Sequence, residues 1–156
     1  MGAVERRIAA LGLSLPRPMS AAGQAFTWVN VRGPRVFVAG HGPGEPGAPR
    51  EPLGRVGAEV SEAEAVALAR EAGLSVLGSL AAALGELDRV AGWCRVLGLV
   101  NAAPGYDRPH VVLDGFSRLV LDVFGEEVGR HARTAVAAVP PFGMAVEIEA
   151  ELLVHE

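Results

Sequence analysis

Apolar and acidic residues alternate regularly over positions 145–154. Successive side chains of a strand point to opposite faces, so this pattern predicts a strand with one face on a core and glutamates on the other. The apolar set is Val146, Ile148, Ala150, Leu152 and Val154, and the acidic set is Glu147, Glu149 and Glu151. The run 132–139 is small and β-branched, which predicts another strand. Two prolines and a glycine within 140–143 indicate a turn, so we expect a hairpin.

Two long helices are predicted in the middle of the chain. Ser61-Glu-Ala-Glu64 has the spacing of a capping box, which predicts a helix over 61–84 that ends at Gly85. A second helix is expected from Pro109, which has no amide to lose, to Phe124, with Gly125 as its end. The buried stripes are expected at Val66, Ala69, Gly73, Val76, Leu77, Leu80 and Leu84 in the first helix, and at Val112, Leu113, Phe116, Leu119, Val120 and Val123 in the second.

The remaining elements are short. A helix is predicted over 4–13, before Pro16 and Pro18. Strands are predicted over 25–31 and 35–40, joined by a tight turn at 32–34, and over 91–100, where apolar residues on both sides favour a central strand. Positions 41–57 hold five glycines and four prolines, so we expect a long loop there and a second loop near 101–105.

The predicted order is ββαβαββ, preceded by the short helix, within a single domain over 1–156. This order is typical of an α+β protein in which two long helices cover one face of a mixed sheet. The other face combines the three glutamates with apolar residues of neighbouring strands. A sheet face that is half apolar and has no helix over it usually meets a partner, so we expect a homo-oligomer.

Composition excludes several classes of function. The net charge is −4 and the basic residues form no block, which argues against a nucleic-acid partner. Cys94 is the single cysteine, so we expect a reducing, cytoplasmic location and an inert core thiol. No membrane partner is expected, because no apolar run approaches the length of a bilayer span. His110 and His155 have no partners at metal-ligand spacing, so no metal is predicted.

Five segments in order carry a family resemblance. They are Val36-Phe-Val-Ala-Gly-His-Gly-Pro43, Leu87-Asp-Arg-Val90, Val123-Phe-Gly125, Ala132-Arg133 and Val146-Glu-Ile-Glu-Ala150. They resemble the motifs of the Rid family (YjgF, L-PSP endoribonuclease-like), and the long segments 41–57 and 101–110 resemble a longer subgroup of it. The resemblance implies a chorismate-mutase-like fold, a homotrimeric barrel with ligand clefts between subunits, and no cofactor.

The resemblance also implies a site. By analogy with active family members, Arg133 would clamp a substrate carboxylate and Glu147 would position a water, with Gly40 at the ligand. Arg133 and Glu147 are 147 − 133 = 14 positions apart, one fewer than expected for the family. The chemistry is consistent, because a guanidinium matches a carboxylate with paired donors and a buried glutamate can move a proton.

Four expected side chains of the family site are replaced. Ala135 stands where the family has a cysteine, Phe26 where it has a tyrosine, Ser117 where it has an asparagine, and His41 where it has a glutamine. We keep Phe26, Ser117 and Ala135 as substrate-binding positions with altered chemistry. His41 lies in the Gly/Pro-rich segment and is expected to be an ordinary loop residue.

Three functions remain open. The first is a cofactor-free hydrolytic deaminase that converts reactive enamines and imines of amino acids into 2-oxo acids and ammonia. The second is a non-catalytic trimer that binds a small carboxylate through Arg133, and the third, ranked lowest, is an endoribonuclease. From the residues alone, Arg133 could instead pair with Glu147 or Glu149 across the hairpin. If the strand has already begun at His131, this residue is expected to point to the face opposite Arg133.

Overall fold

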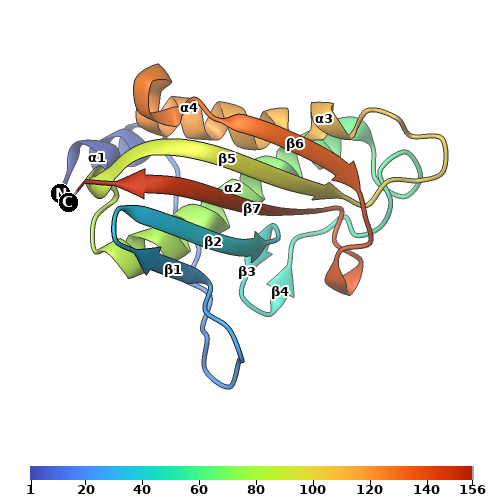
Figure 1. Cartoon of the computed structure of the whole chain (residues 1–156). Helices are drawn as coiled ribbons and strands as arrows, with labels where there is room; N and C mark the ends of the chain where they lie inside the picture. Colours follow the sequence, from blue (N-terminus) through green and yellow to red (C-terminus); the bar gives the residue numbers. More distant parts are fainter. Residues whose placement is uncertain (156) are drawn as a thin grey trace.

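The computed structural model describes residues 1–155 and contains a five-stranded mixed sheet with both long helices on one face (Figure 1). This confirms the predicted α+β fold and the order ββαβαββ. The strand order across the sheet is β1-β2-β7-β5-β6. The strands are β1 Val29–Arg32, β2 Arg35–His41, β5 Val90–Val100, β6 Ala132–Ala137 and β7 Val146–Val154; β3 Gly44–Glu45 and β4 Ala48–Pro49 form a separate small hairpin.

The long helix α2, Glu62–Leu84, begins and ends as predicted. The Ser61 hydroxyl accepts from the Glu64 amide, the Glu64 carboxylate accepts from the Ser61 amide, and Gly85 ends the helix with a φ of 83°. Among the described helices, α2 alone is long and apolar enough for a membrane span, but 67% of the relevant window is buried in the protein. It is therefore a core helix, which packs against the sheet and against the second long helix of the chain.

The second predicted helix is divided in two. A single turn, α3 (Pro109–Val112), is followed by α4 (Asp114–Gly129). Gly125 interrupts the helical backbone with φ 79° and ψ 174°, as its position predicted, but one more turn continues to Gly129. Gly115 lets α4 approach α2 closely, because a Cβ at this position would collide with the Val66 carbonyl.

The predicted hairpin between β6 and β7 is wrong. The chain does reverse at η2, Pro141–Gly143, but β5 lies between the two strands. β6 pairs in parallel with β5, and β7 pairs with β5 in the antiparallel sense. The turn residues determine that the chain reverses. They do not determine which strand pairs with β7, and here that strand is β5.

Several boundaries also differ from the predictions. Helix α1 covers Ala3–Ala10 and ends before Gly12, whose φ of 68° leaves the helical region, so the prolines further on do not set its end. β1 begins at Val29 rather than at 25, which leaves Phe26 in the preceding loop. The predicted loop 41–57 begins with the last residue of β2, His41, and contains β3 and β4.

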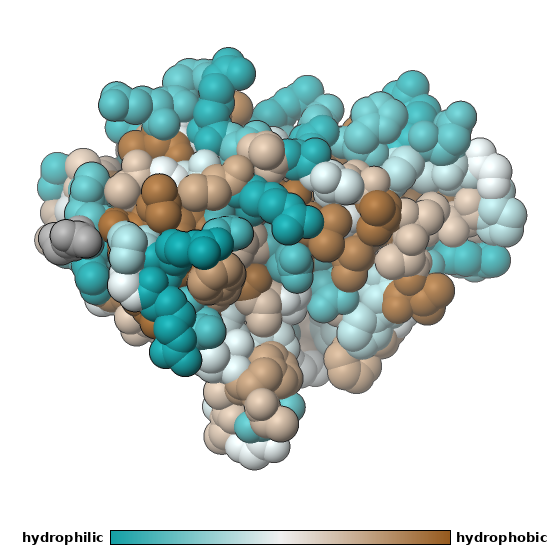
Figure 2. Space-filling model, in the orientation of Figure 1, coloured by the Kyte–Doolittle hydropathy of each residue, from teal (hydrophilic) through white to brown (hydrophobic). Residues whose placement is uncertain are grey.

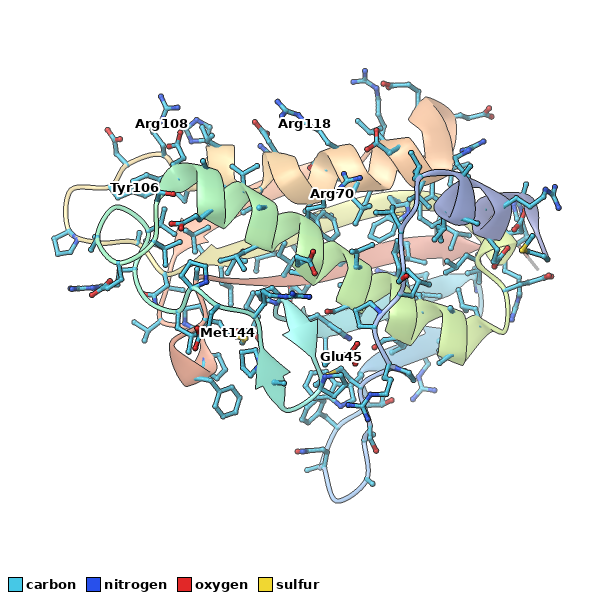
Figure 3. The ribbon with its side chains drawn as sticks, turned by 180° about the vertical axis from the view of Figure 1, so that it is seen from behind. Glu45, Arg70, Tyr106, Arg108, Arg118 and Met144 are labelled. Carbon is cyan, nitrogen blue, oxygen red and sulfur yellow. The ribbon has the colours of Figure 1, made fainter. Side chains whose placement is uncertain are left out.

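The loop after β5 is tied back to the start of α2. The Tyr106 hydroxyl lies 2.8 Å from a Glu62 carboxylate oxygen, and Arg108 Nε lies 3.0 Å from the same oxygen. Figure 3 labels Tyr106 and Arg108 at this end of the molecule, seen from the helix side. These contacts fix the segment that leads into α3.

The sheet face opposite α2 carries the predicted mixture of apolar and charged residues. Glu147, Glu149 and Glu151 lie on it, and the apolar set of β7 is buried under the helices. Figure 2 looks onto this face and shows hydrophobic and hydrophilic side chains interleaved across it. The other side chains on it include Phe37, Leu97, Leu99, Leu153 and two arginines, Arg35 and Arg95, of which Arg35 pairs with Glu151. A homo-oligomer that covers this face stays a prediction.

Candidate functional site

The residues predicted for the site lie in two separate groups. The first, called the arginine cluster, contains Arg133, Ser117, Asp114 and His131 and lies where β6 meets α4. The second, called the glutamate pocket, contains Glu147 and Gly40 and lies beside the β3–β4 hairpin.

Arg133 is held by three contacts in the arginine cluster. Its Nη1 lies 3.0 Å from Asp114 Oδ1 and 3.0 Å from Ser117 Oγ, and its Nη2 lies 2.9 Å from the His110 carbonyl oxygen. A guanidinium has five N–H donors. Within residues 1–155 these contacts leave Nε–H and one Nη2–H for a ligand. The side chain retains 23% of its exposure, so a ligand can reach it.

The ion pair of Arg133 differs from the expected alternative. Its partner is Asp114 in the first turn of α4, and neither Glu147 nor Glu149 contacts it. The sequence analysis missed Asp114. The available signal was that Asp114 and Ser117 are three positions apart, which places both on one helix face.

Ser117 lies in the arginine cluster, with its hydroxyl oxygen against Arg133, and its role in substrate binding stays a prediction. Ala135 follows two residues after Arg133 on the same sheet face, partly buried against the core, and offers only a methyl group. The condition attached to the prediction for His131 is not met, because the strand begins only at Ala132. His131 precedes β6, and its Nε2 lies 2.9 Å from Ser117 Oγ, on the side of Arg133. Burial lowers the pKa of His131, the hydrogen bond to Gly129 raises it, and the charge of Arg133 lowers it further.

The glutamate pocket has a volume of about 160 Å³ and largely apolar walls. Glu147 is half-buried in it, and its pKa is raised by burial first and by the charge of Glu149 second. Gly40 is needed beside it, because a Cβ at this position would overlap the Glu147 carboxylate. Figure 3 labels two further lining residues, Met144 and Glu45, beside the β3–β4 hairpin. The other lining residues are Met19, Trp28, Gly42, Pro43, Gly44, Pro46, Gly47, Pro49, Pro141 and Phe142.

Phe26 and His41 lie near this pocket but outside its walls. Phe26 is 48% exposed and contacts Trp28 edge-on, with ring centroids 4.8 Å apart. His41 is buried, which corrects the expectation of an ordinary loop residue. Its Nε2 lies 2.8 Å from Ser79 Oγ in α2 and its Nδ1 lies 2.7 Å from the Ala39 carbonyl oxygen. Burial lowers the pKa of His41, so the neutral ring links β2 to α2.

The two groups do not share a cleft within one chain. Arg133 lies opposite Val96 of β5, on the helix-covered face, whereas Glu147 lies opposite Leu99, on the open face. Arg133 is on the edge strand β6, and the glutamate pocket is on the β2 side of β7. Each group is therefore half of the predicted site.

Metal ligands do not gather at either group. Within the part of the chain that the structure describes, no three or more His, Cys, Asp or Glu side chains are placed to hold a metal ion. The side chains of the two groups can form hydrogen bonds and charge pairs.

Comparison with known proteins identifies the family. The sequence model of a protein family described as "YjgF/chorismate_mutase-like, putative endoribonuclease" matches residues 5–147. Protein TCP17 of Trypanosoma cruzi is 38% identical over 155 residues, covering 96% of this chain and 92% of that protein.

Solved structures agree in fold. Atu1372 of Agrobacterium tumefaciens, described as of unknown function, is 32% identical with a TM-score of 0.88, covering 97% of this chain and 92% of its own. A "putative endoribonuclease" of Shewanella oneidensis MR-1 is 29% identical with a TM-score of 0.90, covering 98% and 100%. Escherichia coli TdcF with bound serine is 13% identical with a TM-score of 0.56, covering 90% and 94%, and shows the fold alone. The five motifs, the sheet order and the family match over residues 5–147 agree, and the chain belongs to the YjgF/chorismate-mutase-like family.

Proposed function

We propose that the protein is a cofactor-free hydrolase that converts reactive imines of amino acids into 2-oxo acids and ammonia. In this reaction water adds to the carbon of the C=N bond and a proton moves to the nitrogen. The resulting carbinolamine then loses ammonia and leaves the oxo group. The chemistry requires a held carboxylate, a placed water and one group that takes and returns a proton.

The observation that carries the proposal is the environment of Glu147. Its carboxylate is half-buried in a pocket with largely apolar walls, and burial raises its pKa. A general base is most effective when its pKa lies near the working pH, so a raised carboxyl pKa suits transfer of a proton between water and the leaving nitrogen.

Arg133 supplies the second requirement. Its free Nε–H and Nη2–H can bind a carboxylate, and the adjacent Asp114 carboxylate favours a ligand that also carries a protonated nitrogen. An imine of an α-amino acid in its protonated form has both charges. The related TdcF was solved with bound serine, which has the same two groups.

The two half-sites meet, in this proposal, between subunits. Arg133 lies on one edge strand, and the glutamate pocket faces the other side of the sheet. A head-to-tail contact that closes into a ring brings one edge of each subunit to the opposite side of its neighbour. We infer a homotrimer in which Arg133 of one subunit faces the glutamate pocket of the next.

The test is hydrolysis of an imine that an amino-acid oxidase or a serine dehydratase generates in the same cuvette. Oxo-acid release is followed with and without the protein, and a semicarbazide trap reports the imine that remains. Acceleration above the buffer rate by wild-type protein supports the proposal. Imine decay at the buffer rate over the whole range of protein concentration contradicts it.

A non-catalytic carboxylate-binding trimer is the second candidate. The separation of Arg133 from Glu147 within one chain favours it, because Arg133 can bind an anion without help from Glu147. Calorimetric binding of 2-oxobutyrate together with imine decay at the buffer rate is the combined result that selects this function.

A further inference from the structure

The Ser117 hydroxyl forms a hydrogen bond that the proposed imine chemistry does not use. His131 Nδ1 lies 2.7 Å from the Gly129 carbonyl oxygen, so Nδ1 carries the proton in the neutral ring. His131 Nε2 is then an acceptor, and the Ser117 hydroxyl 2.9 Å away donates to it. Arg133 Nη1, at 3.0 Å, donates to the same serine oxygen. One lone pair of Ser117 Oγ is left.

The imidazole is held in place by its surroundings. Its ring contacts Phe116 edge-on, with centroids 6.2 Å apart, and tilts against Trp93 at 6.4 Å. The Ser117–His131 pair lies at a shallow pocket of about 240 Å³. The pocket is lined by Ser117, Leu121, Arg130, His131 and Arg133. A hydroxyl, a base that accepts its proton, and a third group that orients the base form the pattern of an activated nucleophile.

A second Ser–His pair in the chain shows what a structural version looks like. His41 Nε2 lies 2.8 Å from Ser79 Oγ, and His41 Nδ1 lies 2.7 Å from the carbonyl two residues earlier, as in His131. Both residues of this pair are buried, and Ser79 Oγ accepts from the Met19 amide at 3.2 Å. No arginine contacts Ser79 among the contacts of residues 1–155. The two pairs therefore share geometry and differ in access and in the adjacent cation.

We propose that Ser117 and His131 form a nucleophile–base pair that hydrolyses small esters whose acyl group carries a negative charge. Ser117 Oγ bonds to the acyl carbon while its proton passes to His131 Nε2. The bond to the alcohol oxygen then breaks, and His131 returns the proton to that alcohol. Water cleaves the acyl-serine by the same path and releases the acid. Because Arg133 Nη1 lies 3.0 Å from Ser117 Oγ, its guanidinium is close enough to stabilise the negative charge that develops on the acyl oxygen. Arg130 and Arg133 line the pocket, which suits an anionic acyl group.

The protonation state of His131 supports this assignment. Burial and the charge of Arg133 lower its pKa, so the ring is neutral and able to accept a proton at pH 7. No acidic side chain within residues 1–155 contacts the ring. Asp114 is connected to the ring only indirectly, because it pairs with Arg133, and Arg133 in turn contacts Ser117. Beside the pocket, Arg130 pairs with Glu126.

The experiment uses two probes on the wild-type oligomer, a sulfonyl fluoride and the p-nitrophenyl monoester of succinate. Intact mass and peptide mapping locate the sulfonyl group, and p-nitrophenol release measures turnover. We expect the label on Ser117 and none on Ser79. Ser117→Ala should abolish labelling. His131→Gln, which keeps Ser117 and Arg133 in place, should slow ester turnover by about a hundredfold, the usual contribution of a general base.

Ser79→Ala is the matched control, because it removes the serine of the buried pair. At a temperature where this variant is folded by circular dichroism, it should keep the Ser117 label and the ester turnover. The ester turnover of the wild-type protein should fall as the pH drops below the ordinary range of histidine pKa values, because a protonated His131 cannot accept the serine proton. His131→Gln should lack this pH dependence. An unlabelled wild-type protein, a label on another residue, or unchanged turnover in His131→Gln overturns the proposal.

Discussion

At the scale of single residues, surroundings decide what Arg133 and Glu147 can do. Arg133 is oriented by Asp114, Ser117 and the His110 carbonyl, so its remaining donors point in a fixed direction. Glu147 has a neighbour of like charge, Glu149, and a largely apolar pocket. These surroundings support the proposal that Arg133 binds an anion and that Glu147 holds a proton.

Glu147→Gln should stabilise the protein, and more so at high pH. The folded-state pKa of Glu147 is raised, so the folded protein binds more protons than the unfolded chain between the two pKa values. The wild type therefore loses stability as pH rises through the raised pKa, while glutamine is neutral throughout. We expect the melting temperature of Glu147→Gln to exceed that of the wild type at pH 8 and to match it near pH 4.

Glu127→Gln is a suitable control for this experiment, because Glu127 is exposed on the last turn of α4. It should give the same difference in melting temperature at both pH values. If Glu147→Gln behaves like this control, then burial of the carboxylate is not penalised in solution.

Arg133→Lys should weaken binding of 2-oxo acids, because an ammonium cannot reproduce the paired donors of a guanidinium. Arg133→Ala should weaken it further, by about 1.5–3 kcal/mol, the contribution of a hydrogen bond to a charged group. Isothermal titration calorimetry measures both variants. Arg32→Lys, on the exposed end of β1, is the control, and equal affinities in all the variants would exclude Arg133 from the ligand site.

The sequence was sufficient to name candidate residues but not their contacts. Arg133 and Glu147 stand in motifs that resemble those of the family, and Ser117 was aligned with a family asparagine; the roles of all three in a site stay predictions. Asp114 was missed, because its contact with Arg133 joins residues 19 positions apart and depends on how α4 packs beside β6. The separation of Arg133 and Glu147 could not be predicted either. It depends on which strand lies between β6 and β7, and that choice is made by long-range pairing.

At the scale of elements, local signals were sufficient where a contact is local. The capping box, the glycine at the end of α2 and the alternation in β7 each depend on residues within a few positions of one another. The β6–β7 hairpin failed because the Pro140–Gly143 turn specifies a reversal and not a neighbour. β5 lies between the two strands because it pairs in parallel with β6. A helical segment separates β5 from β6 in the sequence, so no local pattern predicts this pairing.

Ser61→Ala tests the start of α2. The substitution removes the acceptor for the Glu64 amide and should lower the free energy of unfolding by about 1 kcal/mol, with ligand binding unchanged. Chemical denaturation of the variant beside Ser14→Ala, at an exposed position before the sheet, gives the comparison. Equal stability of the two variants would mean that the Ser61 cap contributes nothing.

At the scale of the whole molecule, the open sheet face is the basis for the predicted homo-oligomer. Leu97, Leu99 and Phe37 lie on it, opposite the helices. Figure 2 shows hydrophobic and hydrophilic side chains next to one another on this face. Burying this mixture against two further copies would remove the apolar residues from water and let arginines meet glutamates of a neighbour.

Multi-angle light scattering at micromolar concentration should give three times the chain mass of 16.2 kDa. Leu97→Arg, which places a further charge in the face, should shift the protein toward a single chain and abolish imine hydrolysis along with the trimer. A wild-type protein that remains a single chain at these concentrations would remove the shared site.

The position of β6 has a consequence for dynamics. It is an edge strand with one neighbour, β5, and most of its residues are exposed in the single chain. Strands of this kind open locally more often than central strands such as β7, so the amide hydrogens of 132–137 should exchange with deuterium sooner than those of 146–154. Because β6 carries Arg133, a ligand that binds Arg133 as proposed would also hold the strand in place. Ordering of the backbone would then reduce the observed binding free energy. The amide hydrogens of β6 should exchange more slowly when the ligand is bound.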